Sequence, residues 1–139
     1  MSGITTIYRY TKVSEEDIRK LHCMNDEMHY RRQNECGVWN DEHCGMAQVI
    51  GLGNGKLSLF NEDKSLALVC DSKIYNHIEI KKDLIAKGHI FNADSDSEIL
   101  LHLYEEYGSA CLQHLRGMFA FCLWDSRKKQ LFAARDSIG

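Results

Sequence analysis

The sequence predicts an α+β domain in which largely antiparallel sheets are covered by helices. Candidate strands open the chain, helices follow, and strands return at the end, so helices do not alternate regularly with strands as in a doubly wound fold. The 139 residues suit one domain that buries a core without disulfides or a metal. Residues 125–129, between the last two candidate strands, have the length of a hairpin loop.

The N-terminal part of the chain predicts a strand followed by a helix. Residues 4–10 alternate apolar and polar side chains and are rich in β-branched and aromatic types, which is typical of a strand. Ser14 has the character of a helix N-cap, followed by an acidic first turn, and Val13 and Ile18 have the spacing of a hydrophobic staple. An apolar stripe then favours packing of the helix against a sheet: Ile18, Leu21, Met24 and Met28.

The middle of the chain predicts short strands separated by turns. The candidate strands are 37–39, 46–50, 56–60 and the continuous apolar run 66–70. The glycine-rich segment 51–55 lacks the strand-then-helix context and the Lys-Ser/Thr ending of a phosphate-binding loop, so we interpret it as a hairpin-like turn.

Two further helices and a terminal strand pair are expected. One helix covers 76–87, with Asn76 as its cap, Gly88 as its stop and an apolar face made of Ile80, Leu84 and Ile85. The next follows Ser95 and ends at Gly108, with its apolar face made of Ile99, Leu100, Leu103, Tyr104 and Tyr107. A short helical turn at 110–115 then leads into strands 118–124 and 130–134.

The composition argues against several classes of partner. A formal net charge of -3 gives no basic footprint for nucleic acid or an anionic membrane. No apolar run approaches the roughly 20 residues that span a bilayer, and the N-terminus lacks the layout of a secretory signal. We therefore expect a cytoplasmic protein with no nucleic-acid or membrane partner.

Six cysteines are scattered along the chain without a CxxC pair: Cys23, Cys36, Cys44, Cys70, Cys111 and Cys122. This pattern predicts free and mostly buried thiols in a reducing compartment. Cys36, His43 and Cys44 form a local grouping of metal-ligand types, but no second ligand pair completes it. We therefore expect neither a metal nor a cofactor.

Several stretches resemble the N-terminal glutaminase domain of asparagine synthetases, a class II glutamine amidotransferase of the N-terminal-nucleophile hydrolase type. They are Asn-Glu-Asp at 61–63, Ile-Tyr-Asn at 74–76, Ala-Lys-Gly-His at 86–89, the segment 97–108, Leu-Arg-Gly-Met-Phe-Ala-Phe at 115–121 and Ala-Arg-Asp at 134–136. Registered matches from residue 3 to residue 139 are more specific than one short motif. The resemblance implies a four-layer αββα sandwich with the glutaminase pocket at one end of the two sheets. It also implies that 1–139 is one amidotransferase domain without the family's final strand or the synthetase domain that follows.

The nucleophile position differs from the family pattern. The family opens Met-Cys-Gly-Ile and uses the exposed cysteine to attack glutamine, whereas this chain opens Met1-Ser2-Gly3-Ile4. Serine permits removal of Met1, and an α-amine with a pKa near about 8 is able to activate its hydroxyl. A hydroxyl is the weaker nucleophile at neutral pH, so the change is expected to cost much of the rate. An engineered replacement of cysteine would look identical at this position.

The residues that the resemblance assigns to the oxyanion hole also differ. Asp71 and Ser72 stand where the family has Asn and Gly. Loss of one oxyanion-hole donor typically costs about 10² to 10³ in rate, and an ionised Asp71 adds an acceptor that faces a developing negative charge. Lys73 replaces a Glu that holds the α-amine of the substrate, so it is expected to repel that amine.

The remaining substrate contacts are partly kept. Arg31 matches an arginine of the family, but the Gly-Pro turn beside it is lost. Gln48 stands where an arginine of the family clamps the glutamine carboxylate, and an amide cannot supply that bidentate cationic clamp. Asp96 matches the aspartate that binds the α-amine, although helix capping is an alternative role for an Asp beside a Ser.

Three hypotheses follow from these residues. The leading one is a non-hydrolysing amidotransferase-like domain retained as a structural, dimerisation or regulatory module beside a synthetase domain or subunit. The second is an active N-terminal-nucleophile amidohydrolase that releases ammonia from L-glutamine or a related amide. The third is a binding module whose altered pocket, lined by Asp71, Lys73 and Asp96, takes another ligand.

Overall fold

A computed structural model of the chain describes residues 2–28, 36–50, 59–93 and 95–138. The elements are β1 (Gly3–Tyr8), α1 (Glu15–Glu27), β2 (Cys36–Asn40), β3 (Cys44–Val49), β4 (Leu59–Phe60), β5 (Leu66–Ile74), α2 (His77–Ala86), α3 (Asp96–Tyr107), the 3₁₀ helix η2 (Gly108–His114), β6 (Gly117–Asp125) and β7 (Gln130–Arg135). Within the described residues, no helix is long and apolar enough to cross a membrane.

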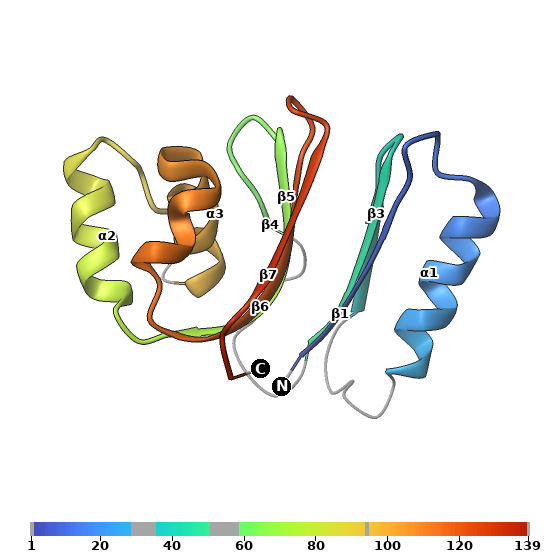
Figure 1. Cartoon of the computed structure of the whole chain (residues 1–139), viewed down its shortest axis with the longest axis horizontal. Coiled ribbons are helices and arrows are strands. Elements are labelled where there is room, and N and C mark those ends of the chain that lie inside the picture. The colour runs from blue at the N-terminus through green and yellow to red at the C-terminus, as the bar shows by residue number, and fades with distance from the viewer. Residues whose placement is uncertain (1, 29–35, 51–58, 94, 139) are drawn as a thin grey trace.

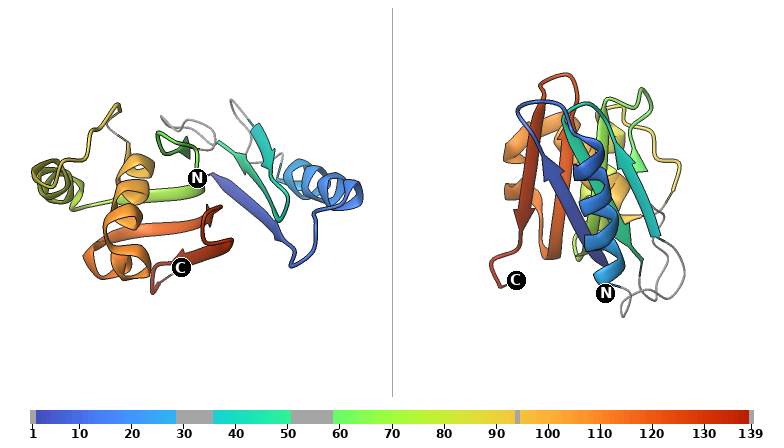
Figure 2. Two further views of the ribbon diagram at one scale, coloured as in Figure 1. Left: turned by 90° about the horizontal axis from the view of Figure 1, so that it is seen from above. Right: turned by 90° about the vertical axis from the view of Figure 1, so that its right-hand side faces the viewer.

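Two sheets face each other, and helices cover their outer faces (Figure 1). One sheet has the order β1-β3-β2 and the other the order β4-β5-β6-β7, and every pairing is antiparallel. Helix α1 lies outside the first sheet, and α2 and α3 lie outside the second (Figures 1 and 2). The predicted α+β class and the four-layer αββα sandwich are confirmed.

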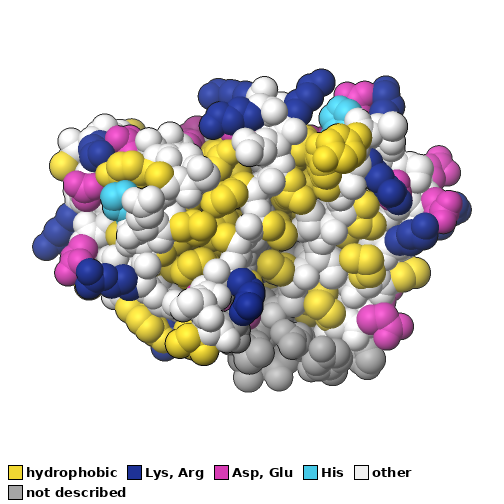
Figure 3. Space-filling model, viewed as in Figure 1, with side chains coloured by type: hydrophobic (Ala, Val, Ile, Leu, Met, Phe, Trp, Pro, Cys, Tyr) yellow, Lys and Arg dark blue, Asp and Glu magenta, His cyan; other side chains and the backbone are white. Residues whose placement is uncertain are grey.

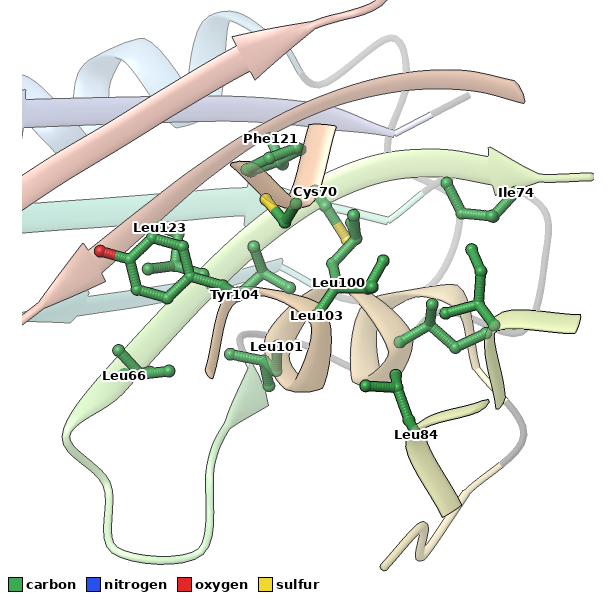
Figure 4. Close-up of a cluster of buried hydrophobic side chains, with 14 residues drawn as sticks. Leu66, Cys70, Ile74, Leu84, Leu100, Leu101, Leu103, Tyr104, Phe121 and Leu123 are labelled. Atoms are coloured by element: carbon green, nitrogen blue, oxygen red, sulfur yellow. The ribbon is translucent and has the colours of Figure 1, made fainter. Parts of the chain in front are cut away.

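The larger core lies between the second sheet and its helices. Leu68 of β5 and Leu123 of β6 point toward Leu100 and Leu103 of α3, and all four side chains are at most 2% exposed. Figure 4 shows α3 lying across this face of the sheet, with Leu84 of α2 at the edge of the cluster. Alternate residues of each strand supply this core because successive side chains point to opposite faces.

A second core lies between the two sheets. Met46 of β3 packs with Val69 of β5 and Trp124 of β6, and Ile4 of β1 lies against this cluster. The Trp124 indole N–H donates to the Asp41 carboxylate, which links the two sheets at the end away from the chain termini. Hydrophobic side chains reach the surface along the seam between the layers, whereas charged side chains lie mainly around it (Figure 3).

Helix α1 begins as predicted. The Ser14 Oγ accepts the Asp17 N–H, and the Asp17 carboxylate accepts the Ser14 N–H, which completes a capping box. The predicted apolar stripe is partly wrong, because Met24 is 38% exposed. The helix instead buries Asp17, Leu21 and Asn25, which lie four residues apart on one face.

Helix α2 keeps its predicted ends with different chemistry at the start. Asn76 occupies the N-cap position without a side-chain cap bond. Its amide instead donates to the His114 carbonyl and accepts the Arg116 N–H, which joins the helix start to η2. Gly88 has φ +98°, the conformation that ends many helices. Ile85 is 52% exposed, so its predicted place on the apolar face is wrong.

Helix α3 and the final strands agree with the prediction. Ser95 caps α3 by accepting the Glu98 N–H, and Gly108 ends the helix with φ +57°. The 3₁₀ helix η2 covers the predicted short helical turn. β6 and β7 form the predicted hairpin.

The bounds of β2, β3, β6 and β7 differ from their predicted ranges by one or two residues, and β1 and β5 also differ. β1 ends at Tyr8, and Tyr10 is 91% exposed. β5 continues four residues past the apolar run, through Ile74, because it pairs with β6 over its whole length. The turn at 51–55 and most of the strand expected at 56–60 lie outside the described residues.

Candidate functional site

The residues singled out by the sequence gather at one end of the sandwich. β1 begins at this end, and β5 and β7 reach it with their last residues (Figure 1). Ser2 precedes β1 and is half-buried, and Asp71, Ser72 and Lys73 lie in the last part of β5. Arg31 lies outside the described residues.

Ser2 is oriented by the strand that follows it. Gly3 faces α1, because a Cβ there would collide with the Met28 sulfur at the helix end. Ile4 packs into the cluster between the sheets. Successive side chains of a strand point to opposite faces. Gly3 faces α1, so we expect the Ser2 side chain to point the other way, toward the space between the sheets.

Gln48 connects the two sheets beside this space. It lies in the central strand β3, opposite Ile4 of β1 and Gly37 of β2, and is 4% exposed. Its Nε2 donates to the Cys70 carbonyl of β5 across a distance of 2.7 Å. A buried amide with this bond is a fixed crosslink between the layers, since breaking it would leave a polar group unpaired.

A groove of about 380 Å³ opens over the ends of β5, β6 and β7. Its lining consists of Asp71, Ser72, Lys73, Met118, Phe119, Ala120, Arg135 and Asp136. Asp71 pairs with Ala120, and Ala120 pairs with Arg135, so these three residues form one row across the sheet. Neighbouring strands are about 4.8 Å apart, which puts the Asp71 and Arg135 backbones roughly 10 Å apart on the same face. The groove therefore carries both signs of charge.

The groove wall at β6 is fixed by Asp136. Its Oδ2 accepts the Phe119 N–H at 2.9 Å, and its own N–H donates to the Phe119 carbonyl at 2.8 Å. Arg135 and Asp136 belong to the Ala-Arg-Asp segment noted in the sequence, but the sequence did not identify them as site residues. Their position at the groove follows from the register of the β6–β7 hairpin.

Asp96 lies next to the groove but serves the scaffold. Its Oδ2 accepts the Ile74 N–H at 2.8 Å, which ties the start of α3 to the end of β5. The cap of α3 is Ser95, so the capping alternative for Asp96 is wrong in detail. The bond holds Asp96 beside the strand that carries Asp71 and Lys73.

Four cysteines, three buried and one half-buried, do not supply a replacement nucleophile. Burial raises the pKa of Cys70, Cys111 and Cys122, and it raises the pKa of Cys44 to about 12. A thiolate is the reactive form, so these four side chains are inert thiols at neutral pH. Cys36 and Cys44 lie at opposite ends of the β2–β3 hairpin, which separates the local grouping of metal-ligand types noted in the sequence.

The fold of this chain matches that of a solved amidotransferase. The glutamine phosphoribosylpyrophosphate amidotransferase of B. subtilis, in complex with ADP and GMP, superposes with a TM-score of 0.68 over 98% of this chain and 37% of that chain. The sequences are 19% identical, so the likeness concerns the fold. The sandwich of this chain therefore has the same fold as a domain of that amidotransferase.

The sequence comparisons identify the family. A family model described as "Glutamine amidotransferase domain" matches residues 1–139. Asparagine synthetase (glutamine-hydrolyzing) 1 of Bacillus subtilis (strain 168) is 38% identical over 120 residues, which cover 84% of this chain and 19% of that protein. Asparagine synthetase (glutamine-hydrolyzing) 2 of Oryza sativa subsp. japonica is 36% identical over all of this chain and 24% of that protein. The chain belongs to the glutamine amidotransferase domain family and spans about a quarter or less of these relatives.

Proposed function

We propose that this domain does not hydrolyse glutamine and serves as a structural, dimerisation or regulatory module of an asparagine-synthetase-like protein. The observation that carries the proposal is the bond from Gln48 Nε2 to the Cys70 carbonyl. At the position expected to clamp a substrate carboxylate stands a neutral amide, and the scaffold already uses one of its two N–H donors. A carboxylate would find at most the one remaining neutral N–H, in place of a bidentate cationic partner.

The electrostatics of the groove support the same proposal. Asp71 lies in the row that also contains Ala120 and Arg135, at the position expected to donate to an oxyanion. A carboxylate there accepts hydrogen bonds, so it opposes the negative charge that develops during amide hydrolysis. Lys73, two residues further along β5, is expected to repel the α-amine that the family's glutamate attracts.

The proposed partner is a synthetase domain or subunit. The relatives of this chain are named as glutamine-hydrolysing asparagine synthetases, and each is several times longer than this chain. We infer that 1–139 is the amidotransferase part of such a protein, located in the cytoplasm, and that it assembles as a homodimer. A module that keeps its buried core and loses its substrate contacts suits such a role.

Glutamate release from the purified chain tests the proposal. Mass spectrometry first establishes that Met1 is removed, because a blocked amine would silence an intact site as well. We expect glutamate formation from L-glutamine to equal that of the Ser2→Ala variant. Glutamate release that disappears in Ser2→Ala would instead support the N-terminal-nucleophile amidohydrolase.

The groove favours a second candidate function, binding of a small zwitterionic ligand. Within the described part of the chain, neither Lys73 nor Arg135 has an ion-pair partner, and Asp71 shares their groove. Two cations and a carboxylate suit a ligand that has both an amine and a carboxylate. Thermal shift with L-glutamine, L-glutamate, L-asparagine and L-aspartate tests this. A saturable shift that is lost in Arg135→Gln would support it, and no shift with any of the four would exclude it for these ligands.

A further inference from the structure

Three ligand-type side chains converge on the helix-covered side of the second sheet. His89 follows α2, and His102 and Glu105 lie on α3. The Nδ1 atoms of the two histidines are 3.2 Å apart. The Glu105 Oε2 lies 2.8 Å from the His102 Nδ1 and 3.6 Å from the His89 Nδ1. The three atoms thus form a small triangle.

The triangle has the dimensions of one face of a tetrahedral zinc site. Zinc binds histidine nitrogen and carboxylate oxygen at about 2.0 to 2.2 Å, so two ligands of a tetrahedron lie about 3.3 to 3.5 Å apart. The three separations, 2.8, 3.2 and 3.6 Å, scatter around that value. Two imidazoles and one carboxylate are also a donor set that suits zinc.

The donors are presented by rigid backbone. The His89 N–H donates to the Leu84 carbonyl and the Gly88 N–H to the Ile85 carbonyl, which is the bond pattern of a Schellman motif at the end of α2. His102 and Glu105 are three residues apart on α3, so they share one face of the helix. A metal would therefore find its ligands already in place.

The loop that carries His89 is also tied to α3. The Asn92 N–H donates to Glu98 Oε1 and the Ala93 N–H to Glu98 Oε2, both at 2.7 Å. Phe91 packs edge-on against the His102 ring, with the ring centroids 4.6 Å apart. The geometry between His89 and α3 is therefore set by contacts outside the ligand triangle.

His89 and Glu105 each have a hydrogen-bond partner outside the ligand triangle. The His89 Nε2 lies 3.2 Å from Glu106 Oε2, and Asn61 Nδ2 donates to Glu105 Oε1 at 2.9 Å. Metal-binding histidines usually donate the second ring N–H to a carboxylate, which fixes the tautomer and leaves the first nitrogen free for the metal. The Glu106 contact has this arrangement.

Without a metal, hydrogen bonds do not satisfy all three ligand atoms of the triangle well. The His102 Nδ1 faces both Glu105 Oε2 and His89 Nδ1, and one N–H cannot point straight at both. An ion at the centre would satisfy all three lone pairs at once. A groove of about 430 Å³ borders the triangle at His89 and Glu105, which leaves room for water at a fourth position.

We propose that His89 Nδ1, His102 Nδ1 and Glu105 Oε2 bind one divalent metal ion of the zinc class, with the fourth position open to water in the adjoining groove. This site is separate from the groove at the strand ends, and it does not depend on whether glutamine is hydrolysed. The ion would fasten the end of α2 to the second half of α3, and so hold together the layer that covers the second sheet.

Metal titration of the full chain tests the proposal. The protein is stripped with a chelator, its fold is checked by circular dichroism, and zinc binding is measured by competition with a chromophoric chelator. The variants are His89→Gln and Glu105→Gln. The control is His22→Gln, which removes an exposed imidazole of α1. Cobalt spectra of the wild type distinguish this site from cysteine binding, because thiolate ligands add a charge-transfer band.

We expect one zinc per chain, and a cobalt spectrum with tetrahedral d–d bands and no thiolate band. Each ligand variant is expected to lose at least about tenfold in affinity, and His22→Gln none. Zinc binding that is absent in the wild type, unchanged in both ligand variants or accompanied by a thiolate band would overturn the proposal. The wild-type spectrum alone decides the matter if a variant does not fold.

Discussion

Gln48 Nε2 of the first sheet donates to the Cys70 carbonyl of the second across 2.7 Å, so one side chain joins the two layers beside the candidate site. The sequence resemblance predicts a substrate contact at position 48, and in this structure the Gln48 side chain bonds to the scaffold. The link is buried, and its acceptor is a backbone group of the strand that carries Asp71 and Lys73. The position of Asp71 and Lys73 therefore depends on a buried contact beside the groove.

Replacing Gln48 by Ala is expected to lower the free energy of unfolding by about 1–3 kcal/mol, because the Cys70 carbonyl is left buried without this donor. Urea unfolding of the two proteins measures the difference. Gln113→Ala is the matched control, since Gln113 is exposed on η2. Equal losses in the two variants would show that the inter-sheet bond contributes nothing.

Asp96 gives a second test of the scaffold interpretation. Asp96→Ala removes the acceptor of the Ile74 N–H and is expected to cost about 1.5–3 kcal/mol, the range for a bond to a charged group. Asp96→Asn keeps an oxygen at that place and is expected to restore part of the loss. Thermal unfolding of the two variants provides the comparison. An Asn variant no better than Ala would argue against the Ile74 bond as the cause.

Gly117 fixes the start of β6 against the end of β5. Its φ is +152°, and a Cβ would collide with the Lys73 carbonyl. Gly117→Ala is therefore expected to cost about 2–4 kcal/mol, from backbone strain together with the steric conflict. Gly108→Ala also strains a positive φ but meets open space, so about 1–2 kcal/mol is expected. A reversed order of the two losses in urea unfolding would contradict the packing at Lys73.

Acid stability tests the start of α1. The pKa of the Asp17 carboxyl is lowered, mainly by the hydrogen bond from Arg9 and then by the Ser14 N–H. Its contribution to stability is therefore present above the unfolded pKa of about 3.9, and it is lost as the pH falls toward the folded value. The difference in unfolding midpoint between wild type and Asp17→Asn should be largest near about pH 6 and shrink toward about pH 2.5. A constant difference over that range, or the same trend in Glu27→Gln, would contradict this assignment.

Much of the fold could be predicted from the sequence, because residues that favour helix starts and ends stand where the folded chain begins and ends its helices. Ser14 and Ser95 cap the helices that their neighbours predict, and Gly88 and Gly108 end them. Errors arose where an apolar side chain stays exposed. Ile85 fits an amphipathic face but points outward. The periodicity of a helix gives the width of a stripe, and the partner layer decides how much of it is buried.

Less of the candidate site could be predicted from the sequence. The change of charge at Asp71 and Lys73 was evident from the resemblance, but their place in β5 was missed because polar residues ended the apolar run. Arg135 joins the groove through the register of β7 on β6, which depends on hairpin geometry. The bond from Gln48 to Cys70 joins residues 22 positions apart in different sheets, and no local pattern announces such a contact.

Glutamine hydrolysis by the Ser2→Cys variant tests the central claim most directly, because it restores the family's nucleophile and leaves the rest of the pocket unchanged. The measurement is glutamate formation after mass spectrometry has confirmed an exposed N-terminal cysteine. A glutamine-hydrolysing asparagine synthetase serves as the positive control. We predict glutamate formation no higher than in Ser2→Ala, because Gln48, Asp71 and Lys73 still oppose substrate binding and catalysis. Sustained turnover by Ser2→Cys would contradict the account and show that the nucleophile alone had been lost.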